Sequence, residues 1–192
     1  MSAIRNLALI LVLALAGSWT TNAAAADDAA LWRALSDGRH FAMIRHALAP
    51  GAGDPPGFAL GDCSTQRNLN EIGRAQARRV GDHFRAAGIW RARVYSSQWC
   101  RCRDTAAEMN LGPFQELPLL NSFYDDPTRG GRQIEALRAW VARQPLTEPT
   151  VLVTHFTVIS GLAGAAPKSG EVVFVRRDEY GNFKAVGSIL AK

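Results

Sequence analysis

Residues 39–46, RHFAMIRH, carry four consecutive apolar residues directly before an arginine and a histidine, Arg45 and His46. Residues 150–155, TVLVTH, are similar, with three consecutive apolar residues before Thr154 and His155. Short continuous apolar runs of this kind are typical of strands buried inside a sheet. The pattern therefore predicts two buried strands, each followed by a histidine.

The rest of the sequence surrounds these strands with alternating helical and extended segments. Asn70 is a good helix N-cap, and apolar residues then recur at helical spacing until Gly88. Residues 47–65 and 117–132 are rich in glycine, proline and aspartate without a regular period, which predicts two long loops. We expect helices at 29–36, 70–87, 98–110, 133–143 and 158–163, and strands at 39–45, 94–96, 150–154, 171–176 and 183–189.

This alternation predicts the fold class. It indicates an α/β fold with three layers, α/β/α, around a mainly parallel central sheet. The last two strands flank a turn at 180–182, which suggests a hairpin. Because active sites in such sheets lie at the carboxyl ends of strands, His46 and His155 stand where this architecture places reactive groups.

The first residues have the layout of a secretory signal peptide. One positive residue, Arg5, precedes an unbroken apolar run over 7–16, and polar residues and alanines follow. That run is shorter than the ~20 residues needed to cross a bilayer. We therefore expect residues 1–26 to be a signal peptide and 27–192 to form one exported domain, periplasmic or secreted, with no stable membrane insertion after cleavage.

The composition limits the classes of partner. The net charge is +5, and the arginines are scattered along the chain without forming basic blocks. This favours acidic small molecules or glycans as ligands and gives little support for nucleic acid. Taken alone, the charge is equally consistent with a basic surface that has no functional meaning.

Three cysteines follow the predicted signal peptide, at Cys63, Cys100 and Cys102. An oxidising destination favours one disulfide, between Cys63 and either Cys100 or Cys102, and three free thiols are the alternative. A zinc site is the weaker interpretation, since no second Cys or His pair supplies the remaining ligands at suitable spacing. We expect no metal site.

A third segment strengthens the case for a common site. Residues 94–106, VYSSQWCRCRDTA, form another strand end that runs into a helix and carries Arg101. An Arg-His pair alone is a weak signal in an arginine-rich chain, and a strand end that faces solvent explains it as well. We expect the three segments together to place two imidazoles and two guanidiniums around one small volume.

Such a group of side chains suits a phosphoryl ligand. Guanidinium groups bind phosphate oxygens bidentately, and a helix N-terminus adds backbone donors. A neutral imidazole can attack phosphorus and form a phosphohistidine, which water then hydrolyses. A second imidazole and the arginines would stabilise charge on the equatorial oxygens.

These motifs, in this order, resemble the histidine phosphatase superfamily, also called phosphoglycerate mutase-like. The likeness rests on Arg45-His46, on Ser96-Ser97 followed by Arg101 and Thr105, on the helix opening NLNEIGRAQA, and on Thr154-His155. It extends over nearly all of residues 27–192.

The resemblance implies roles for these residues. His46 would be the nucleophile that becomes phosphorylated, and Arg45, Arg101 and His155 would form the phosphate pocket. It also implies a mixed sheet flanked by helices, in keeping with the fold predicted above. Neither a metal nor an organic cofactor is implied.

The sequence departs from the family pattern at several positions. Ala47 stands where glycine is usual, and we expect its methyl group to crowd the phosphate approach slightly. Gln98-Trp99 replaces a Pro-Leu pair, and we expect this change to alter only packing. Phe156 follows the second histidine, where another branch of the family has an aspartate.

The proton donor is the most serious departure. Family members often place a glutamate in the segment after the arginine helix, and the nearest residue here, Asn121, cannot act as an acid. Asp125 and Asp126 follow on the same loop. We assign Asp125 as the preferred donor and Asp126 as a second candidate that contacts substrate. A solvated turn before Pro127 explains both aspartates equally well.

The loop sequence DCSTQRN, which leads into the helix after the first motif, holds lesser candidates. Arg67 and Asn68 are predicted to contact substrate and Asp62 to fix the loop, although capping and loop structure explain them as well. Substrate specificity is expected to come from loops 50–61 and 121–131.

The expected function follows from compartment and resemblance. We expect an exported phosphatase that hydrolyses phosphomonoesters through a phosphohistidine on His46, with phosphorylated small molecules or glycans, such as envelope sugars, as substrates. Export and compact size disfavour a glycolytic mutase and a cytosolic phosphohistidine-signalling phosphatase. The alternative from a different class is a binding module that keeps the phosphate pocket but has lost turnover.

Overall fold

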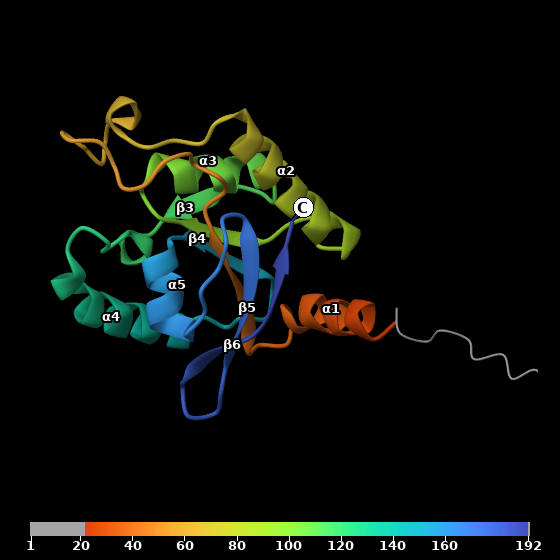
Figure 1. Ribbon diagram of the computed structural model, residues 1–192. Coiled ribbons are helices and arrows are strands. Elements are labelled where there is room, and N and C mark those ends of the chain that lie inside the picture. The colour runs from red at the N-terminus through yellow and green to blue at the C-terminus, as the bar shows by residue number, and fades with distance from the viewer. Residues whose placement is uncertain (1–21, 192) are drawn as a thin grey trace, which may run out of the picture.

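Six strands form one sheet at the centre of the molecule, in the spatial order β3-β2-β4-β1-β5-β6 (Figure 1). The computed structural model describes residues 22–191. The strands are β1 (His40–Arg45), β2 (Arg93–Ser96), β3 (Phe114–Glu116), β4 (Thr150–Thr154), β5 (Glu171–Arg177) and β6 (Phe183–Leu190).

The sheet is parallel over four strands and antiparallel at one side. β2 pairs in parallel with β3 and β4, and β4 pairs in parallel with β1. β5 is antiparallel to β1 and forms an antiparallel hairpin with β6. The prediction of a mainly parallel sheet that ends in a hairpin is confirmed. Periodicity did not reveal β3, because three residues are too few to show a pattern.

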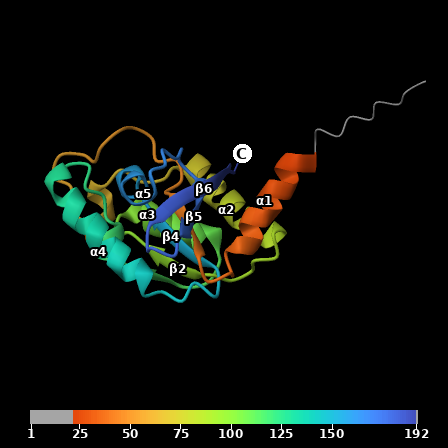
Figure 2. The ribbon, with the colours of Figure 1, turned by 90° about the horizontal axis from the view of Figure 1, so that it is seen from below.

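Helices cover both faces of the sheet. They are α1 (Asn22–Ala34), α2 (Glu71–Ala86), α3 (Cys100–Met109), α4 (Gly130–Ala142) and α5 (Phe156–Ala163). The first three pack on one face, and α4 and α5 pack on the other (Figures 1 and 2). The predicted three-layer α/β/α architecture is therefore confirmed.

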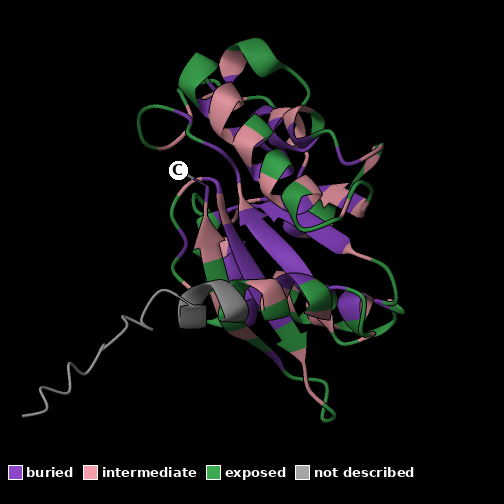
Figure 3. Cartoon of the chain, turned by 90° about the vertical axis from the view of Figure 1, so that its right-hand side faces the viewer, coloured by how far each residue is buried: buried purple, intermediate pink, exposed green. Residues whose placement is uncertain are grey.

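Alternate residues of β1 supply the two hydrophobic cores. Ala42 and Ile44 belong to the cluster under α1, α2 and α3, while Phe41 and Met43 belong to the cluster under α4 and α5. All four side chains are fully buried, and the central strands are buried along their length (Figure 3). Because helices cover both faces of these strands, polar groups can reach a ligand only where the strands end.

Besides α1, which begins at Asn22 where the sequence predicts a helix from residue 29, two helices begin earlier than the periodicity predicts. A 3₁₀ turn at Pro127–Arg129 leads directly into α4, so the helix starts at Gly130 and the loop before it is shorter than expected. α5 starts immediately after His155, and Phe156 and Thr157 therefore belong to its first turn. This second difference changes which groups face the strand ends.

The start of α2 lies against the chain that follows β1. The Asn70 side chain caps the helix by accepting a hydrogen bond from the N–H of Gly73, 2.9 Å, as predicted. A methyl group at Gly73 would come within 2.0 Å of the carbonyl oxygen of Leu48. The absence of a side chain therefore lets α2 approach the segment just beyond His46.

The structure describes only the last residues of the predicted signal peptide. Residues 1–21 of the predicted signal peptide lie outside the described residues, and residues 22–26 are the beginning of α1. Between residues 22 and 191, no helix combines the length and the apolar character needed to cross a membrane. Cleavage of residues 1–26 stays a prediction.

Candidate active site

The three predicted motifs meet at the carboxyl ends of β1, β2 and β4. Arg45 is paired with Thr154 in the sheet register, and the N–H of His46 donates to the carbonyl of Thr154, 2.9 Å. The N–H of Ser97 donates to the carbonyl of Val153 at the same distance. The main chain thus brings both strand-end histidines and the start of α3 to one edge of the sheet.

A cavity of about 260 Å³ opens at this edge. Every residue predicted for the phosphate pocket lines it, and both loops expected to set specificity contribute. The lining comes from the strand ends (Arg45, His46, His155), from α3 (Arg101), from the first loop (residues 51–54, Arg67), from the second loop (Ser122, Tyr124, Asp125) and from α5 (Phe156, Thr157).

His46 is buried, with its two ring nitrogens in different environments. Nδ1 lies 2.8 Å from the carbonyl oxygen of Ala47, and because a carbonyl only accepts, Nδ1 carries the proton. Nε2 therefore keeps its lone pair. Burial, followed by the positive charge of Arg101, lowers the pKa of His46 to about 3. The ring is neutral above this pH, which is the state that can attack phosphorus.

Ala47 supports the nucleophile and does not face the ligand. Its N–H donates to the hydroxyl of Thr105, 3.0 Å, which fixes the peptide that orients His46. Its methyl group is fully buried and packs with Leu69 and Ala77, away from the residues that line the cavity. The expectation that this methyl crowds the phosphate approach is wrong, because the side chain belongs to a small apolar cluster behind the loop.

The ring of His155 lies beside that of His46, with 5.5 Å between the centroids and 66° between the planes. Its Nε2 is 2.8 Å from the hydroxyl of Ser97 and 3.4 Å from the thiol sulfur of Cys102. The same serine hydroxyl donates to Oδ1 of Asn121, 3.1 Å. Burial, then the neighbouring His46, lowers the pKa of His155 well below its usual value. Nδ1 is the ring nitrogen left for a ligand.

Three arginines supply positive charge to the cavity. Arg67 donates from Nε to the carbonyl of Gly53, 2.7 Å, and from Nη1 to the carbonyl of Ala49. Burial and the nearby Arg101 lower the pKa of both Arg45 and Arg67. Nε of Arg45 and Nε of Arg101 are buried without a hydrogen-bond partner in the described part of the chain. These N–H groups are available to an anion.

Asp54 is a site residue that the sequence motifs do not predict. Its carboxylate accepts from Nη1 and Nη2 of Arg101, 2.7 and 3.1 Å, from Nε1 of Trp99, 3.0 Å, and from the N–H of Arg67, 3.1 Å. Burial alone would raise the pKa of Asp54, but these bonds, led by those of Arg101, lower it. The sequence signal is weak, because a single aspartate among glycines and prolines is typical of an ordinary turn.

Trp99 is part of the same arrangement. Its ring packs edge-on against His155, with 5.2 Å between centroids, and stacks on Phe58 at 5.1 Å. Its Nε1 donates to Asp54. The expectation that Gln98-Trp99 alters only packing is wrong, because the indole links a carboxylate to the second histidine.

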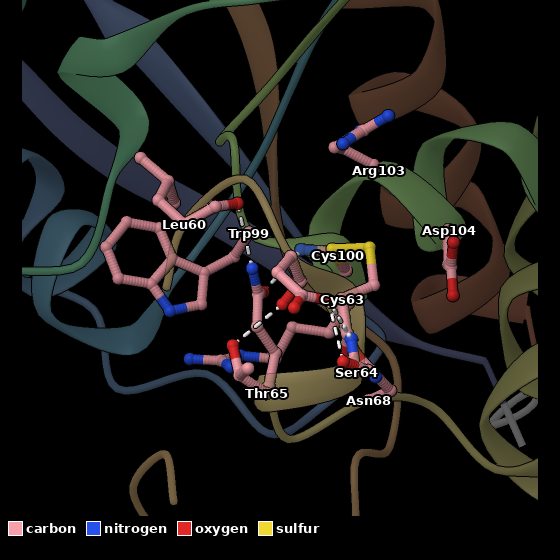
Figure 4. The surroundings of a disulfide bond; sticks show 12 residues. Leu60, Cys63, Ser64, Thr65, Asn68, Trp99, Cys100, Arg103 and Asp104 are labelled. Carbon is pink, nitrogen blue, oxygen red and sulfur yellow. Dashed lines mark hydrogen bonds between the residues drawn. A yellow bond between two sulfur atoms is a disulfide. The ribbon is translucent and has the colours of Figure 1, made fainter. Parts of the chain in front are cut away.

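A disulfide joins Cys63, in the loop before α2, to Cys100, the first residue of α3 (Figure 4). Of the two pairings left open by the sequence, the structure has this one, and Cys102 is a buried free thiol. Burial raises the pKa of Cys102 to about 12. Oε1 of Gln66 also accepts from the N–H of Cys100, 2.9 Å. Two contacts thus hold the loop at the start of α3.

The remaining predicted residues divide between the cavity and its surroundings. Arg67 and Asp125 line the cavity. Asn68 and Asp126 do not, because each is used in a local turn: the Asn68 amide donates to the carbonyl of Cys63, 2.6 Å, and the Asp126 carboxylate accepts from a hydroxyl two residues ahead. The structure thus places both residues outside the cavity lining, and their contact with substrate stays a prediction.

Asn121, at the position of the usual family glutamate, is buried and does not line the cavity. Its Oδ1 accepts from the N–H of Gln98, 2.9 Å, as well as from Ser97, and its Nδ2 donates to Oε1 of Gln98, 2.8 Å. Asn121 therefore holds the segment that positions His155.

The first turn of α5 faces the cavity through Phe156 and Thr157. The Thr157 hydroxyl is buried and has no partner among residues 22–191. In α3, by contrast, the N–H of Cys100 is already bound to a glutamine side chain. The backbone donors that a helix N-terminus offers to an anion are therefore expected from α5.

The described residues, 22–191, include no group of three or more His, Cys, Asp or Glu side chains arranged to hold a metal ion. The positive charge at the cavity comes from guanidinium groups. A phosphoryl dianion in this cavity would therefore meet arginines and imidazoles directly.

Part of the sequence matches a known protein family. The sequence profile of the histidine phosphatase superfamily (branch 1) matches residues 43–122, which include the end of β1 and the whole of α2 and α3. A separate comparison with curated proteins gives no match. Residues 43–122 therefore match the sequence pattern of this superfamily, in agreement with the resemblance seen in the motifs.

Solved phosphatase structures share this fold. The protein histidine phosphatase SixA complexed with tungstate has a TM-score of 0.55 at 20% identity, over 79% of this chain and 97% of that one. Mycobacterial glucosyl-3-phosphoglycerate phosphatase complexed with VO3 has a TM-score of 0.58 at 15% identity, over 80% and 100%. A phosphoserine phosphatase mutant from Entamoeba histolytica, in complex with phosphoserine, has a TM-score of 0.57 at 13% identity, over 78% and 95%. At these identities the likeness establishes the fold.

Proposed function

We propose that this chain is an exported phosphatase that hydrolyses phosphomonoesters through a phosphohistidine on His46. The observation that carries the proposal is one cavity in which the neutral His46, with its Nε2 lone pair free, lies beside His155 and three arginines. Two of the solved structures with this fold hold oxyanions, tungstate and VO3. Such anions resemble a phosphoryl group in charge and in their oxygen ligands.

The proposed reaction has two steps. In the first, Nε2 of His46 forms a bond to phosphorus while the bond from phosphorus to the ester oxygen breaks, and the leaving oxygen takes a proton from an acid. In the second, water attacks phosphorus and gives a proton to the carboxylate that served as the acid, while the bond to His46 breaks and phosphate leaves. The carbonyl of Ala47, which accepts from Nδ1–H, stabilises the positive charge that develops on the ring during attack.

Asp125 is the proposed proton donor. It lines the cavity on the second loop, next to Ser122 and Tyr124, and its side chain is exposed. Asp54 is unsuited to this role, because its carboxylate is paired with Arg101 and its pKa is lowered. A carboxyl group that stays open to the cavity can pick up a proton again from water after each turnover.

Phosphorylated sugars of the cell envelope are the proposed substrates. Tyr124 and Phe156 line the cavity with 65% and 41% of their surface exposed, so two aromatic faces border the anion-binding groups. The apolar face of a sugar ring can pack on such a surface. One solved structure with this fold is a glucosyl-3-phosphoglycerate phosphatase. The predicted export of residues 27–192 would bring the cavity to envelope glycans.

Export itself is proposed from the N-terminal sequence pattern. The disulfide between Cys63 and Cys100 supports it, because disulfides persist in oxidising compartments such as the periplasm and the cell exterior. Expression of the full chain, followed by fractionation and N-terminal sequencing of the protein, tests this part. A protein that keeps residues 1–26 and stays with reduced cysteines in the cytosol would contradict it.

The enzymatic part is tested by hydrolysis of p-nitrophenyl phosphate from pH 4 to pH 7. We expect His46→Ala to lose at least about 10³-fold in kcat, because the nucleophile is gone. His83→Ala is the matched control, since His83 lies on α2 and does not line the cavity. Vanadate binding without turnover in the unaltered protein would favour the binding module, and equal activity in both variants would exclude His46 as nucleophile.

A further inference from the structure

Asp54 lies among the residues that line the cavity, and its carboxylate already accepts as many hydrogen bonds as it can. The two oxygens accept four hydrogen bonds, from Nη1 and Nη2 of Arg101, from Nε1 of Trp99 and from the N–H of Arg67. A carboxylate has about four acceptor sites. Only 6% of the Asp54 side chain is exposed. It is therefore a built-in part of the wall and has no acceptor site left for a ligand.

The bonds to Asp54 also decide which edge of Arg101 is free. A guanidinium has an end-on fork, formed by Nη1 and Nη2, and a side-on fork, formed by Nε and the second hydrogen of Nη2. Asp54 occupies the end-on fork. Arg101 lines the cavity, and only 4% of its side chain is exposed. Its Nε is buried and has no hydrogen-bond partner within residues 22–191. An unpaired buried donor on a charged group is costly unless a ligand satisfies it.

Two further contacts extend from the same carboxylate. The indole that donates to Oδ2 of Asp54 belongs to Trp99, whose ring packs against His155. The backbone N–H that donates to Oδ1 belongs to Arg67, which lines the cavity. One carboxylate thus contacts Arg101 and Arg67, which line the cavity, and Trp99, whose ring packs against His155.

We propose that Asp54 is a positioning residue: it fixes Arg101 so that the side-on fork, Nε and Nη2, binds the phosphoryl oxygens, and it holds Trp99 and Arg67 in the same wall. This inference rests on the proposed function of the cavity. In this arrangement the Arg101 guanidinium donates to Asp54 from its end-on fork and to the ligand from its side-on fork at the same time. Asp54 itself does not touch the substrate.

The opposite role is that of a competitor, in which the Asp54 carboxylate occupies Arg101 until phosphate displaces it. The two roles predict changes of opposite sign. Removing a competitor frees the arginine and tightens anion binding. Removing a positioning group loosens the arginine and weakens anion binding.

The experiment measures orthovanadate and phosphate binding by calorimetry, together with p-nitrophenyl phosphate turnover. For Asp54→Asn, which keeps the shape but loses the charge, we expect binding to weaken about tenfold to a hundredfold, the range for a hydrogen bond to a charged group. Asp62→Asn is the matched control: Asp62 caps the 3₁₀ turn of the same loop by accepting from Ser64 and does not line the cavity. It should bind vanadate as the unaltered protein does.

A double-mutant cycle with Arg101→Lys shows whether Asp54 acts through Arg101. Lysine keeps the charge but has no fork, so Asp54→Asn in that background should weaken binding by less than about threefold. Unchanged or tighter binding in the single variant, or an equal loss in both backgrounds, would overturn the proposal.

A milder variant covers the case in which Asp54→Asn does not fold. Trp99→Phe removes one donor to the carboxylate and keeps an aromatic ring beside His155, so we expect vanadate binding to weaken several-fold. Unaltered affinity would overturn the proposal.

Binding is measured without turnover, so this result stands even if the protein proves to be a binding module. If turnover is present and Asp54→Asn has no effect, only this inference fails.

Discussion

Asp125 and Asp126 are neighbours in the sequence, but only the first lines the cavity. An acid matters most when the leaving oxygen is a poor leaving group, so Asp125→Asn should lower kcat about 10²-fold for a sugar phosphate. For p-nitrophenyl phosphate, whose phenolate leaves without help, the loss should be less than about threefold. Steady-state kinetics with both substrates measures the difference.

The matched control for this prediction is Asp126→Asn. The Asp126 carboxylate accepts from Thr128 in a local turn, so its loss should leave both substrates nearly unaffected. An equal effect of the two substitutions, or an effect of Asp125→Asn that does not depend on the leaving group, would remove Asp125 from the mechanism.

At the scale of single residues, the sequence predicts groups whose place follows from a strand. His46 and His155 each follow an apolar run, and the end of a buried strand has a known position in the fold. Asp54 follows no such element. Its contact with Arg101, 47 residues away, depends on the path of a loop, and loop conformation has no periodic signal. The contacts of Trp99 with Asp54 and Phe58 depend on the path of the same loop and are unpredictable for the same reason.

The disulfide is the contact that most directly joins the first loop to a helix. It links Cys63 to Cys100 across 37 residues of chain. In the entropic model a loop of this length stabilises the folded state by about 3–4 kcal/mol. We therefore expect Cys63→Ser with Cys100→Ser, or reduction of the unaltered protein, to lower the free energy of unfolding by about 3 kcal/mol, measured by urea denaturation.

The double variant supplies the control for reduction. Dithiothreitol should shift the urea midpoint of the unaltered protein and leave that of the double variant unchanged, since Cys102 has no partner to lose. Equal midpoints for oxidised and reduced protein would show that the crosslink adds nothing to stability.

Elements were predictable where a single pattern determines them. Asn70 caps α2 as expected, because an N-cap is a local feature of the chain. The start of α4 was placed too late, because a 3₁₀ turn and a helix have similar composition and differ only in how the backbone closes. β3 is a strand because it pairs with β2, and three residues are too short to predict that pairing.

For the whole molecule, the cavity places two neutral imidazoles in a positively charged and buried environment. This arrangement keeps both histidine rings, including the nucleophile, unprotonated in the folded protein at acidic pH. Burial first, and then Arg101 or the other histidine, lowers the pKa of His46 to about 3 and that of His155 well below its usual value. Unfolding releases both rings to water, where a histidine has a pKa of about 6.5.

The sign of the resulting pH dependence follows from proton uptake. Below pH 6.5 the unfolded chain binds protons that the folded protein does not, so the free energy of unfolding falls as the pH falls. Each histidine contributes up to about 1.4 kcal/mol per pH unit between 6.5 and its folded pKa. The ion pair of Asp54 with Arg101 acts in a lower window: its stabilisation is present above about pH 4 and is lost as the pH falls through the lowered pKa of Asp54.

We therefore expect stability to decline from pH 6.5 to pH 4 by on the order of 3–5 kcal/mol, measured by urea denaturation at several pH values. The variant His46→Asn, which has no titrating ring at this position, should show about half of that slope, while all other titrating groups stay the same. Saturating phosphate should flatten the curve further, because a bound anion stabilises the folded state and favours protonated rings beside it. Stability that does not change between pH 6.5 and pH 4 would mean that these imidazoles are not held neutral in the fold.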